Sequence, residues 1–271
     1  MKNTMNNMTL SSYFNDIVFH FYEDPSMIIR QGEEWGIQVQ NDYFRALSFL
    51  YPSDKLVTYD MQQELRQILA PVIQCSALNS AIDPHQFLRS DKGVVLFLIG
   101  RSKEDLIACT EEVCSTALRL LEEALPDAFI RIGIGTMETG LDGIELTYQN
   151  AIQAVNVGEK FKKQRRILDY IGMEIYSAIN AMVIAHGASM IKSILKQLTR
   201  EEQTILGKYY KCKELIPDTA QALGITEEEV RHCLTQIKER TGLDVNDTED
   251  NFKLNFIMIA KRVLEKEKQR R

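Results

Sequence analysis

Seven polar side chains between residues 226 and 238 could contact the base edges and phosphates of double-stranded DNA if one helix carries them all. Arginine and lysine bind phosphates or guanine, and glutamate accepts a hydrogen bond from the cytosine amino group. Spacings of three and four residues bring such side chains to one side of a helix. The pattern therefore predicts a recognition helix that starts at Thr226. The seven candidates are Thr226, Glu227, Glu228, Arg231, His232, Thr235 and Lys238.

The start of this predicted helix is acidic. Thr226 and Glu229 form a Thr-x-x-Glu capping box, and glutamates in the first turn complement the helix dipole. The same charges repel phosphates, so DNA binding should be modest and steeply salt-dependent. Binding also needs phosphate contacts from basic neighbours. The candidates for these contacts are Lys208, Lys211, Lys213, Arg231, Lys238 and Arg240.

The segment around residue 224 has the spacing of a helix-turn-helix core. Such a core needs a small residue where the helices cross, a glycine in the left-handed turn, and apolar side chains between the helices. An ordinary helical hairpin has similar spacing and stays open as an alternative. The predicted core residues are Ala220, Gly224, Ile225, Val230 and Leu234.

Other reactive side chains form no recognisable catalytic or metal-binding pattern. The histidines are scattered, the five cysteines include no C-x-x-C pair, and the glycines at 133 and 135 lack the spacing of a dinucleotide-binding loop. We therefore expect no enzyme activity, no metal and no cofactor, and we expect reduced thiols. The residues in question are His20, His85, His186, His232, Cys75, Cys109, Cys114, Cys212 and Cys233.

The charge of the chain is unevenly distributed. The net charge is −6, which argues against a protein coated in basic surface. From Leu195 onward there are 15 Lys and Arg against 14 Asp and Glu, whereas the first 194 residues carry 17 against 24. The amino terminus is polar and no apolar run reaches about 18 residues, so we expect a cytoplasmic protein without a membrane segment.

Strand and helix patterns alternate before residue 172 and only helices follow. The predicted order is two helices around Asp24-Pro25, then β, α, β, β, α, β, α, β, which indicates an α+β, ferredoxin-like mixed sheet covered by helices. An all-α helix-turn-helix domain is expected behind it. The predicted regions are N-terminal helices over 1–40, an α/β domain over 41–172, a helical connector over 173–198 and the helix-turn-helix domain over 199–271.

The boundaries of the predicted elements follow from periodicity and turn residues. Helices are expected over 61–75, 102–125 and 141–161. Strands are expected over 46–51, 87–89, 94–100, 129–135 and 166–169, and Gly93 closes the tight turn between the second and third of these. Thr199 and Glu202 form a further predicted capping box.

Two segments resemble the purine-catabolism and carbohydrate-diacid regulator family. The tail is similar to that family's C-terminal helix-turn-helix domain, whose recognition helix is followed by T-G-L-D, here Thr241 to Asp244, and by D-x-x-D, here Asp247 to Asp250. Phe129 to Phe161 is similar to the degenerate GGDEF-like domain of the same family, and Trp35-Gly36-Ile37 stands where that domain begins.

The resemblance implies a DNA-binding transcription regulator that acts as a homodimer on a double-stranded operator. In the family the recognition helix opens with His-Arg-Asn-Thr, whereas this chain has Thr226 to Glu229 there, and the family's inducer cannot be carried over to it. A small-molecule effector is therefore expected without a named identity. The alternative is a ligand-sensing or protein-interaction module that keeps the fold but has lost DNA binding.

A working GGDEF cyclase would need carboxylates at the end of its first strand and at the hairpin to hold Mg²⁺. The chain has Phe49 to Pro52 at the first position and Arg89 to Gly93 at the second. We therefore expect the GGDEF-like domain to be non-catalytic, and we interpret Asp91 as a turn residue.

Overall fold

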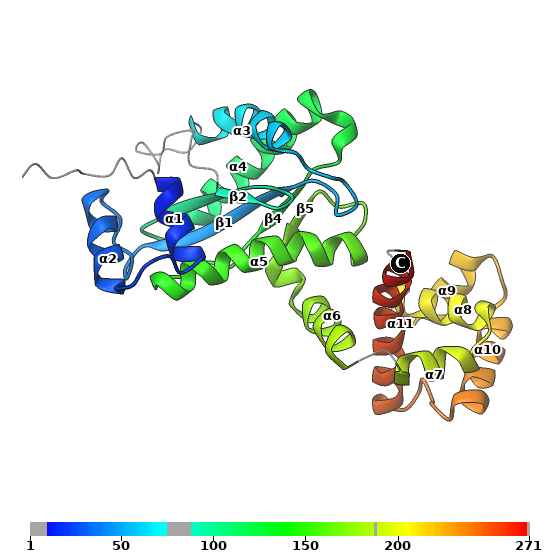
Figure 1. Ribbon diagram of the computed structural model, residues 1–271. Coiled ribbons are helices and arrows are strands. Elements are labelled where there is room, and N and C mark those ends of the chain that lie inside the picture. The colour runs from blue at the N-terminus through cyan, green and yellow to red at the C-terminus, as the bar shows by residue number, and fades with distance from the viewer. Residues whose placement is uncertain (1–9, 75–87, 187–188, 270–271) are drawn as a thin grey trace, which may run out of the picture. The chain divides into compact units, whose positions relative to one another are not determined.

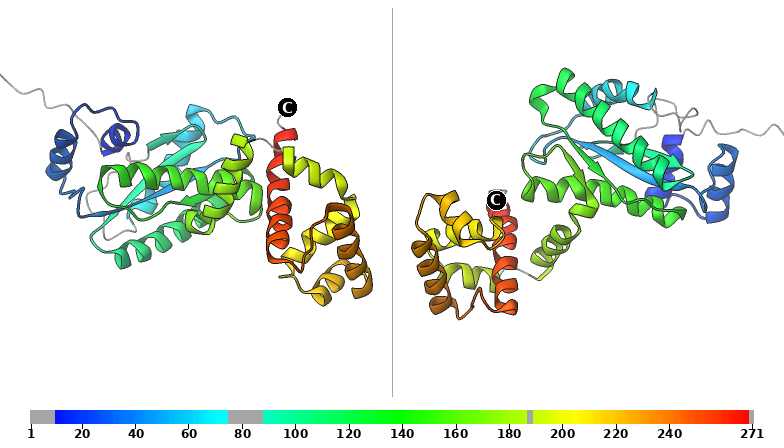
Figure 2. Two further views of the ribbon diagram at one scale, coloured as in Figure 1. Left: turned by 90° about the horizontal axis from the view of Figure 1, so that it is seen from below. Right: turned by 180° about the vertical axis from the view of Figure 1, so that it is seen from behind.

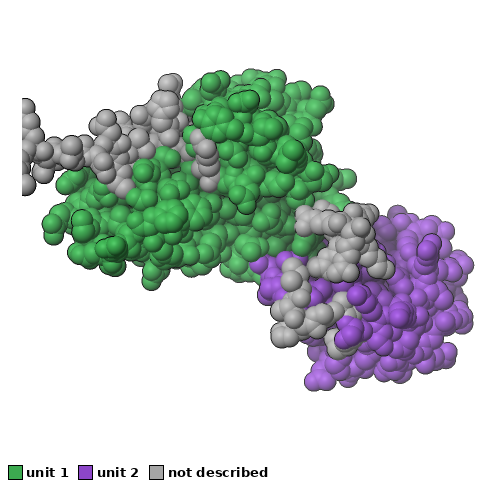
Figure 3. Space-filling model, in the orientation of Figure 1, with its two compact units in different colours: residues 1–174 green, residues 175–271 purple. Residues whose placement is uncertain are grey.

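The computed structural model describes residues 10–74, 88–186 and 189–269 (Figure 1). The chain divides into two compact units, Met1–Glu174 and Ile175–Arg271, shown in separate colours in Figure 3. Parts of the sequence predictions lie outside the described residues, namely residues 1–9, Cys75, His85 and Phe87. No helix among the described residues is long and apolar enough to cross a membrane.

A mixed five-stranded sheet forms the centre of the first unit. Its strands, in the order β2-β3-β1-β4-β5, pair antiparallel except for β4 and β5, which are parallel. The predicted α+β class with a mixed sheet is therefore confirmed. The strands are β1 (Tyr43–Leu50), β2 (Leu88–Ser90), β3 (Gly93–Gly100), β4 (Arg131–Ile134) and β5 (Ile167–Asp169).

Helices cover both faces of this sheet (Figures 1 and 2). Side chains of α3 and α4 pack on one face, and side chains of α1 and α5 pack on the other. The Asp24 side chain caps α2 by accepting from the Ser26 amide, as expected for Asp-Pro at a helix start. The helices are α1 (Leu10–Val18), α2 (Pro25–Glu34), α3 (Tyr59–Gln74), α4 (Lys103–Ala124) and α5 (Gly140–Phe161).

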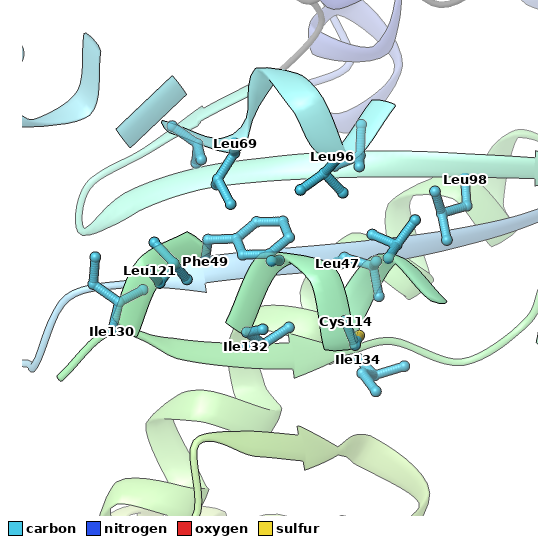
Figure 4. Close-up of a cluster of buried hydrophobic side chains, with 14 of the residues drawn as sticks. Leu47, Phe49, Leu69, Leu96, Leu98, Cys114, Leu121, Ile130, Ile132 and Ile134 are labelled. Atoms are coloured by element: carbon cyan, nitrogen blue, oxygen red, sulfur yellow. The ribbon is translucent and has the colours of Figure 1, made fainter. Parts of the chain in front are cut away.

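The central strand β1 is buried on both faces. Leu47 and Phe49 point into the cluster beneath α3 and α4 (Figure 4), whereas Phe44 and Ala46 belong to the cluster on the α1 and α5 side. This alternation follows from the two-residue period of a strand. Ser48 is fully buried on the same face as Ala46, and its hydroxyl donates to the carbonyl of Ala151 in α5 at 2.8 Å.

Two strand boundaries differ from the sequence prediction by more than one residue. Strand β1 begins at Tyr43 rather than Ala46, because its pairing with β3 continues to Tyr43 opposite Gly100. Strand β4 begins at Arg131 rather than Phe129, because Phe129 has a φ of 45° and ends a 3-10 turn at Pro126–Ala128. Both differences depend on tertiary pairing and a local turn, which residue periodicity does not report.

The second unit is all-helical in its described residues. Residues 173–198, predicted as a helical connector, contain two separate helices, α6 and α7. The predicted capping box at the start of α8 is confirmed, since Thr199 and Glu202 each bond the other's backbone amide. The helices are α6 (Glu174–His186), α7 (Ser189–Gln197), α8 (Arg200–Lys211), α9 (Ile216–Leu223), α10 (Glu227–Thr241) and α11 (Thr248–Gln269).

Candidate nucleic-acid interface

The turn between α9 and α10 is built around Gly224. Its φ of 68° is left-handed, a conformation that glycine adopts without the cost a Cβ imposes. The Ile225 amide donates to the Ala220 carbonyl at 3.1 Å, the six-to-one bond of a glycine-terminated helix. The chain therefore stops α9 and starts α10 within three residues.

The five predicted core residues lie where helices α8 to α11 meet, with Gly224 in the turn. Val230 is fully buried, and Ala220 and Leu234 are nearly so, while Ile225 is half-buried at the edge of the same cluster. The cluster is completed by Leu206 of α8 and Leu254 of α11, among others. These contacts fix which side of α10 faces inward, and therefore which side faces solvent.

The start of α10 is held by a reciprocal capping box. Thr226 Oγ1 accepts from the Glu229 amide at 3.2 Å, and the Glu229 carboxylate accepts from the Thr226 amide at 2.7 Å and from its hydroxyl at 2.8 Å. These hydrogen bonds hold the pKa of Glu229 below its usual value. Glu229 therefore belongs to the helix start, and Thr226 is engaged there as well.

All seven predicted contact residues are exposed. The buried stripe of α10 consists of Val230, Cys233, Leu234 and Ile237, and the helix presents its opposite side to solvent. The structure thus gathers the seven predicted residues on the accessible surface of one helix, namely Thr226, Glu227, Glu228, Arg231, His232, Thr235 and Lys238.

Several of these side chains are already paired. Arg231 contacts Glu227 at 3.2 Å across one helical turn, and Lys238 contacts Asp244 at 2.7 Å beyond the helix end. Asp244 also raises the pKa of Lys238. The described residues show no such partner for Glu228. A DNA contact by Arg231 or Lys238 therefore competes with an exposed ion pair, and such pairs are weak.

Sequence reasoning missed Glu239. It is exposed and follows Thr235 by four residues and His232 by seven, so it extends the same outward face. The helical spacing alone could have found it. Its carboxylate adds a second negative charge, besides Glu228, to the part of α10 that points furthest from the core.

Besides Arg231 and Lys238, which form the exposed ion pairs described above, the predicted phosphate contacts fall into two groups. Arg240 is bound to the buried carboxylate of Glu202 at 3.1 Å, so it holds α10 to α8. By contrast, no ion pair is found within the described residues for Lys208, Lys211 or Lys213, which lie at the end of α8 and in the turn before α9. That turn has left-handed residues at Lys213 and Glu214.

In the first unit, the two positions where a working cyclase would need metal-binding carboxylates are apolar or belong to a turn. Leu50 at the end of β1 pairs with Gly93 at the start of β3, so the strand end and the hairpin are neighbours. Leu50 and Tyr51 are buried there, and Asp91 lies in the turn between β2 and β3. Burial raises the pKa of Tyr51. Among the described residues, no group of three His, Cys, Asp or Glu side chains could hold a metal ion.

The described cysteines are free thiols. Cys109, Cys114 and Cys233 are buried and Cys212 is half-buried. Burial raises the pKa of Cys114 and of Cys233 to about 12 each. A thiol with such a pKa is protonated at neutral pH and is a poor nucleophile.

The first unit thus combines a mixed sheet, covered by helices on both faces, with a tight hairpin of β2 and β3, and a helical unit follows it in the chain. The GGDEF-like domain family matches residues 22–157, and the chain belongs to this family. No curated protein sequence matches the chain. Among solved structures, the chain is similar to the regulator of polyketide synthase expression from Bifidobacterium adolescentis, at 13% identity, over 94% of this chain and 98% of that chain, with a TM-score of 0.44.

Proposed function

We propose that the chain is a dimeric, DNA-binding transcription regulator whose α9 and α10 form a helix-turn-helix. The observation that carries the proposal is the pair of faces on α10. Val230 and Leu234 are buried on one side, while Arg231, His232 and Thr235 are exposed on the other. In a helix-turn-helix the second helix enters the major groove with such an exposed face.

The charges of the surface define how it would bind. The lysines before α9 supply phosphate contacts, and α10 supplies base contacts through Arg231 to guanine and Glu228 to the cytosine amino group. Because Glu228 and Glu239 repel phosphates, affinity depends on both half-sites of a two-fold operator being occupied. The expected partners are therefore duplex DNA and a second copy of the chain.

Fluorescence anisotropy with labelled genomic fragments, at low salt and then at increasing salt, tests DNA binding directly. We expect selected fragments to bind better than random duplex. Lys211→Ala should weaken binding to all sequences and reduce the salt slope by about one, whereas the matched control Lys196→Ala, an exposed lysine on α7, should not. Equal binding of selected and random duplexes would refute the proposal.

A second candidate function is a protein-interaction or ligand-sensing module that has lost DNA binding. The acidic outer face of α10, with Glu227, Glu228 and Glu239, favours it. Replacing Glu227 and Glu228 by arginine separates the two functions. If the wild type binds an operator and the variant loses its sequence preference, the first function holds. If only the variant binds DNA, the second function holds.

We further propose that the GGDEF-like unit is non-catalytic and relays a signal or assists dimerisation. The apolar end of β1 supports this, because a cyclase needs metal-binding carboxylates there. Its sheet supports a ferredoxin-like assignment, since β1-α3-β2 and β3-α4-β4 are two interleaved βαβ units with antiparallel neighbours. The proposal includes a cytoplasmic location, no cofactor and a small-molecule effector of unassigned identity.

A further inference from the structure

A pocket of about 580 Å³ lies in the first unit, between α5 and the hairpin of β2 and β3. All the residues that line it belong to this unit. Small-molecule sites in proteins commonly have volumes of about 300–1,000 Å³, and they combine an apolar wall with a few polar groups. This pocket has both parts, and its size suits one small organic molecule.

Two aromatic rings and two aliphatic side chains form the apolar wall of the pocket. Phe19, in the turn after α1, meets the Tyr148 ring of α5 edge-on, with ring centroids 6.0 Å apart. Leu50 at the end of β1 and Ile152, one helical turn beyond Tyr148, complete the wall. Burial raises the pKa of Tyr148 to about 12, and the charge of Asp91 adds to this effect. The phenol is therefore neutral at pH 7.

The polar side of the pocket holds an exposed carboxylate that has no counter-ion. Among the described residues, the Asp91 side chain in the hairpin turn forms no ion pair and no hydrogen bond. The ammonium of the neighbouring Lys92 donates instead to the Lys55 carbonyl at 2.7 Å. The Ser90 hydroxyl, also at the pocket, is buried and lacks a hydrogen-bond partner within the described ranges. Leaving such a group unpaired is costly, so a ligand that bonds it gains affinity.

These groups favour a cation over the nucleotide of a cyclase. A triphosphate held by Mg²⁺ needs carboxylates around the metal, whereas Leu50 stands at the end of β1, and the unpaired Asp91 would repel phosphates. A protonated amine, by contrast, is attracted by a carboxylate and by the faces of aromatic rings within about 6 Å. Its N–H groups also match the acceptor oxygens of Asp91 and Ser90.

We propose that this pocket binds a small organic amine in its protonated form. The apolar body of the amine lies against Phe19 and Tyr148, and its ammonium group lies at Asp91. The proposal deepens the proposed function and rests on it for its biological role, since it names the chemical class of the small-molecule effector and the unit that senses it.

Isothermal titration calorimetry of the full chain tests the pocket with three probes of similar shape. They are 2-phenylethylamine, the neutral 2-phenylethanol and the anionic 3-phenylpropionate. We expect the amine to bind with a Kd of about 1 mM or lower, and about tenfold or more tightly than the other two, because a hydrogen bond to a charged group is stronger than a neutral one. In Asp91→Asn the difference between the amine and the alcohol should disappear. The matched control is Asp105→Asn, at an exposed position of α4, which should bind the amine as the wild type does.

A second pair of variants tests the aromatic wall. Phe19→Ala should weaken amine binding by about threefold or more, because it removes one ring from the pocket. The control is Phe21→Ala, since Phe21 is 68% exposed and does not line the pocket. Circular dichroism of each variant checks that the fold is retained.

Four results would overturn the proposal. They are a wild type that binds no 2-phenylethylamine at about 10 mM, equal amine binding by Asp91→Asn, equal weakening by Asp105→Asn, and binding of 3-phenylpropionate as tight as that of the amine. Anisotropy with labelled duplex DNA separates this inference from the proposed function. Amine binding by a protein that never binds DNA supports the pocket and refutes the proposed function. DNA binding without amine binding supports the proposed function and overturns the pocket.

Discussion

The buried ion pair between Arg131 of β4 and Glu159 of α5 provides the most quantitative prediction. Their side chains are 9% and 6% exposed, and Arg131 Nη1 lies 3.1 Å from Glu159 Oε1. The same carboxylate oxygen accepts from the Ser53 amide at 3.0 Å, and Arg131 also donates to the Lys163 carbonyl at 3.1 Å. The pair thus joins α5, β4 and the loop after β1.

Replacing Glu159 by glutamine should destabilise the first unit by about 3–5 kcal/mol. At 3.1 Å and an effective dielectric constant of about 20, the attraction between the two charges is about 5 kcal/mol. Removing one partner leaves the arginine charge buried and uncompensated, which is the costly case. Burial already lowers the pKa of Arg131 even with Glu159 beside it. Replacing both residues by apolar ones, Arg131→Met with Glu159→Leu, should cost much less.

Urea unfolding followed by tryptophan fluorescence measures this change in the first unit. Trp35 is the only tryptophan of the chain and packs edge-on against Tyr13 at 5.3 Å, so its emission reports the GGDEF-like unit and not the helical unit. Glu111→Gln, at an exposed position of α4, is the matched control and should change stability by less than about 0.5 kcal/mol. A loss below about 1 kcal/mol for Glu159→Gln, or a double variant less stable than the single one, would show that the reasoning is wrong.

Three further predictions concern backbone packing and the start of α10. Gly133→Ala should lower the free energy of unfolding of the first unit by at least about 2 kcal/mol, because an added Cβ would collide with the Ala151 carbonyl. Urea unfolding followed by tryptophan fluorescence measures this change, and a variant as stable as the wild type would contradict it. Thr226→Ala should cost the helical unit about 1 kcal/mol through loss of the cap, seen as a lower midpoint in thermal melting by circular dichroism, whereas Thr226→Ser should melt like the wild type. Because the pKa of Glu229 is lowered, its stabilising contribution is full above the ordinary value of 4.5 and is lost as the pH falls through the lowered value. Melting midpoints should therefore fall with acidification, and they should fall less in Thr226→Ala. Parallel curves of melting midpoint against pH for the two proteins would count against this assignment.

Local features of the candidate interface could be predicted from sequence because each depends on neighbouring residues. The capping box needs only Thr226 and Glu229, three positions apart, and the left-handed turn needs only a glycine between two helices. The exposed and buried sides of α10 follow from the 3.6-residue period. The alternation of strands and helices in the first unit was readable for the same reason.

Pairing between distant residues could not be predicted in this way. The extra length of β1 depends on its register with β3. The ion pair between Arg240 and Glu202 depends on how α8 and α10 cross. Sequence reasoning therefore counted Arg240 among the phosphate contacts, although its guanidinium forms an ion pair with a buried carboxylate within the fold. The ion pair of Arg131 with Glu159 gave no local signal either.

The sequence by itself determined the elements, the acidic character of α10 and the side of that helix which faces solvent, because these follow from residue type and short-range spacing. Only the tertiary structure decided which charges are already paired and which carboxylates are buried. The physical reason is that burial and ion pairing depend on segments far apart in the chain meeting in space, and a periodic pattern carries no information about its partner.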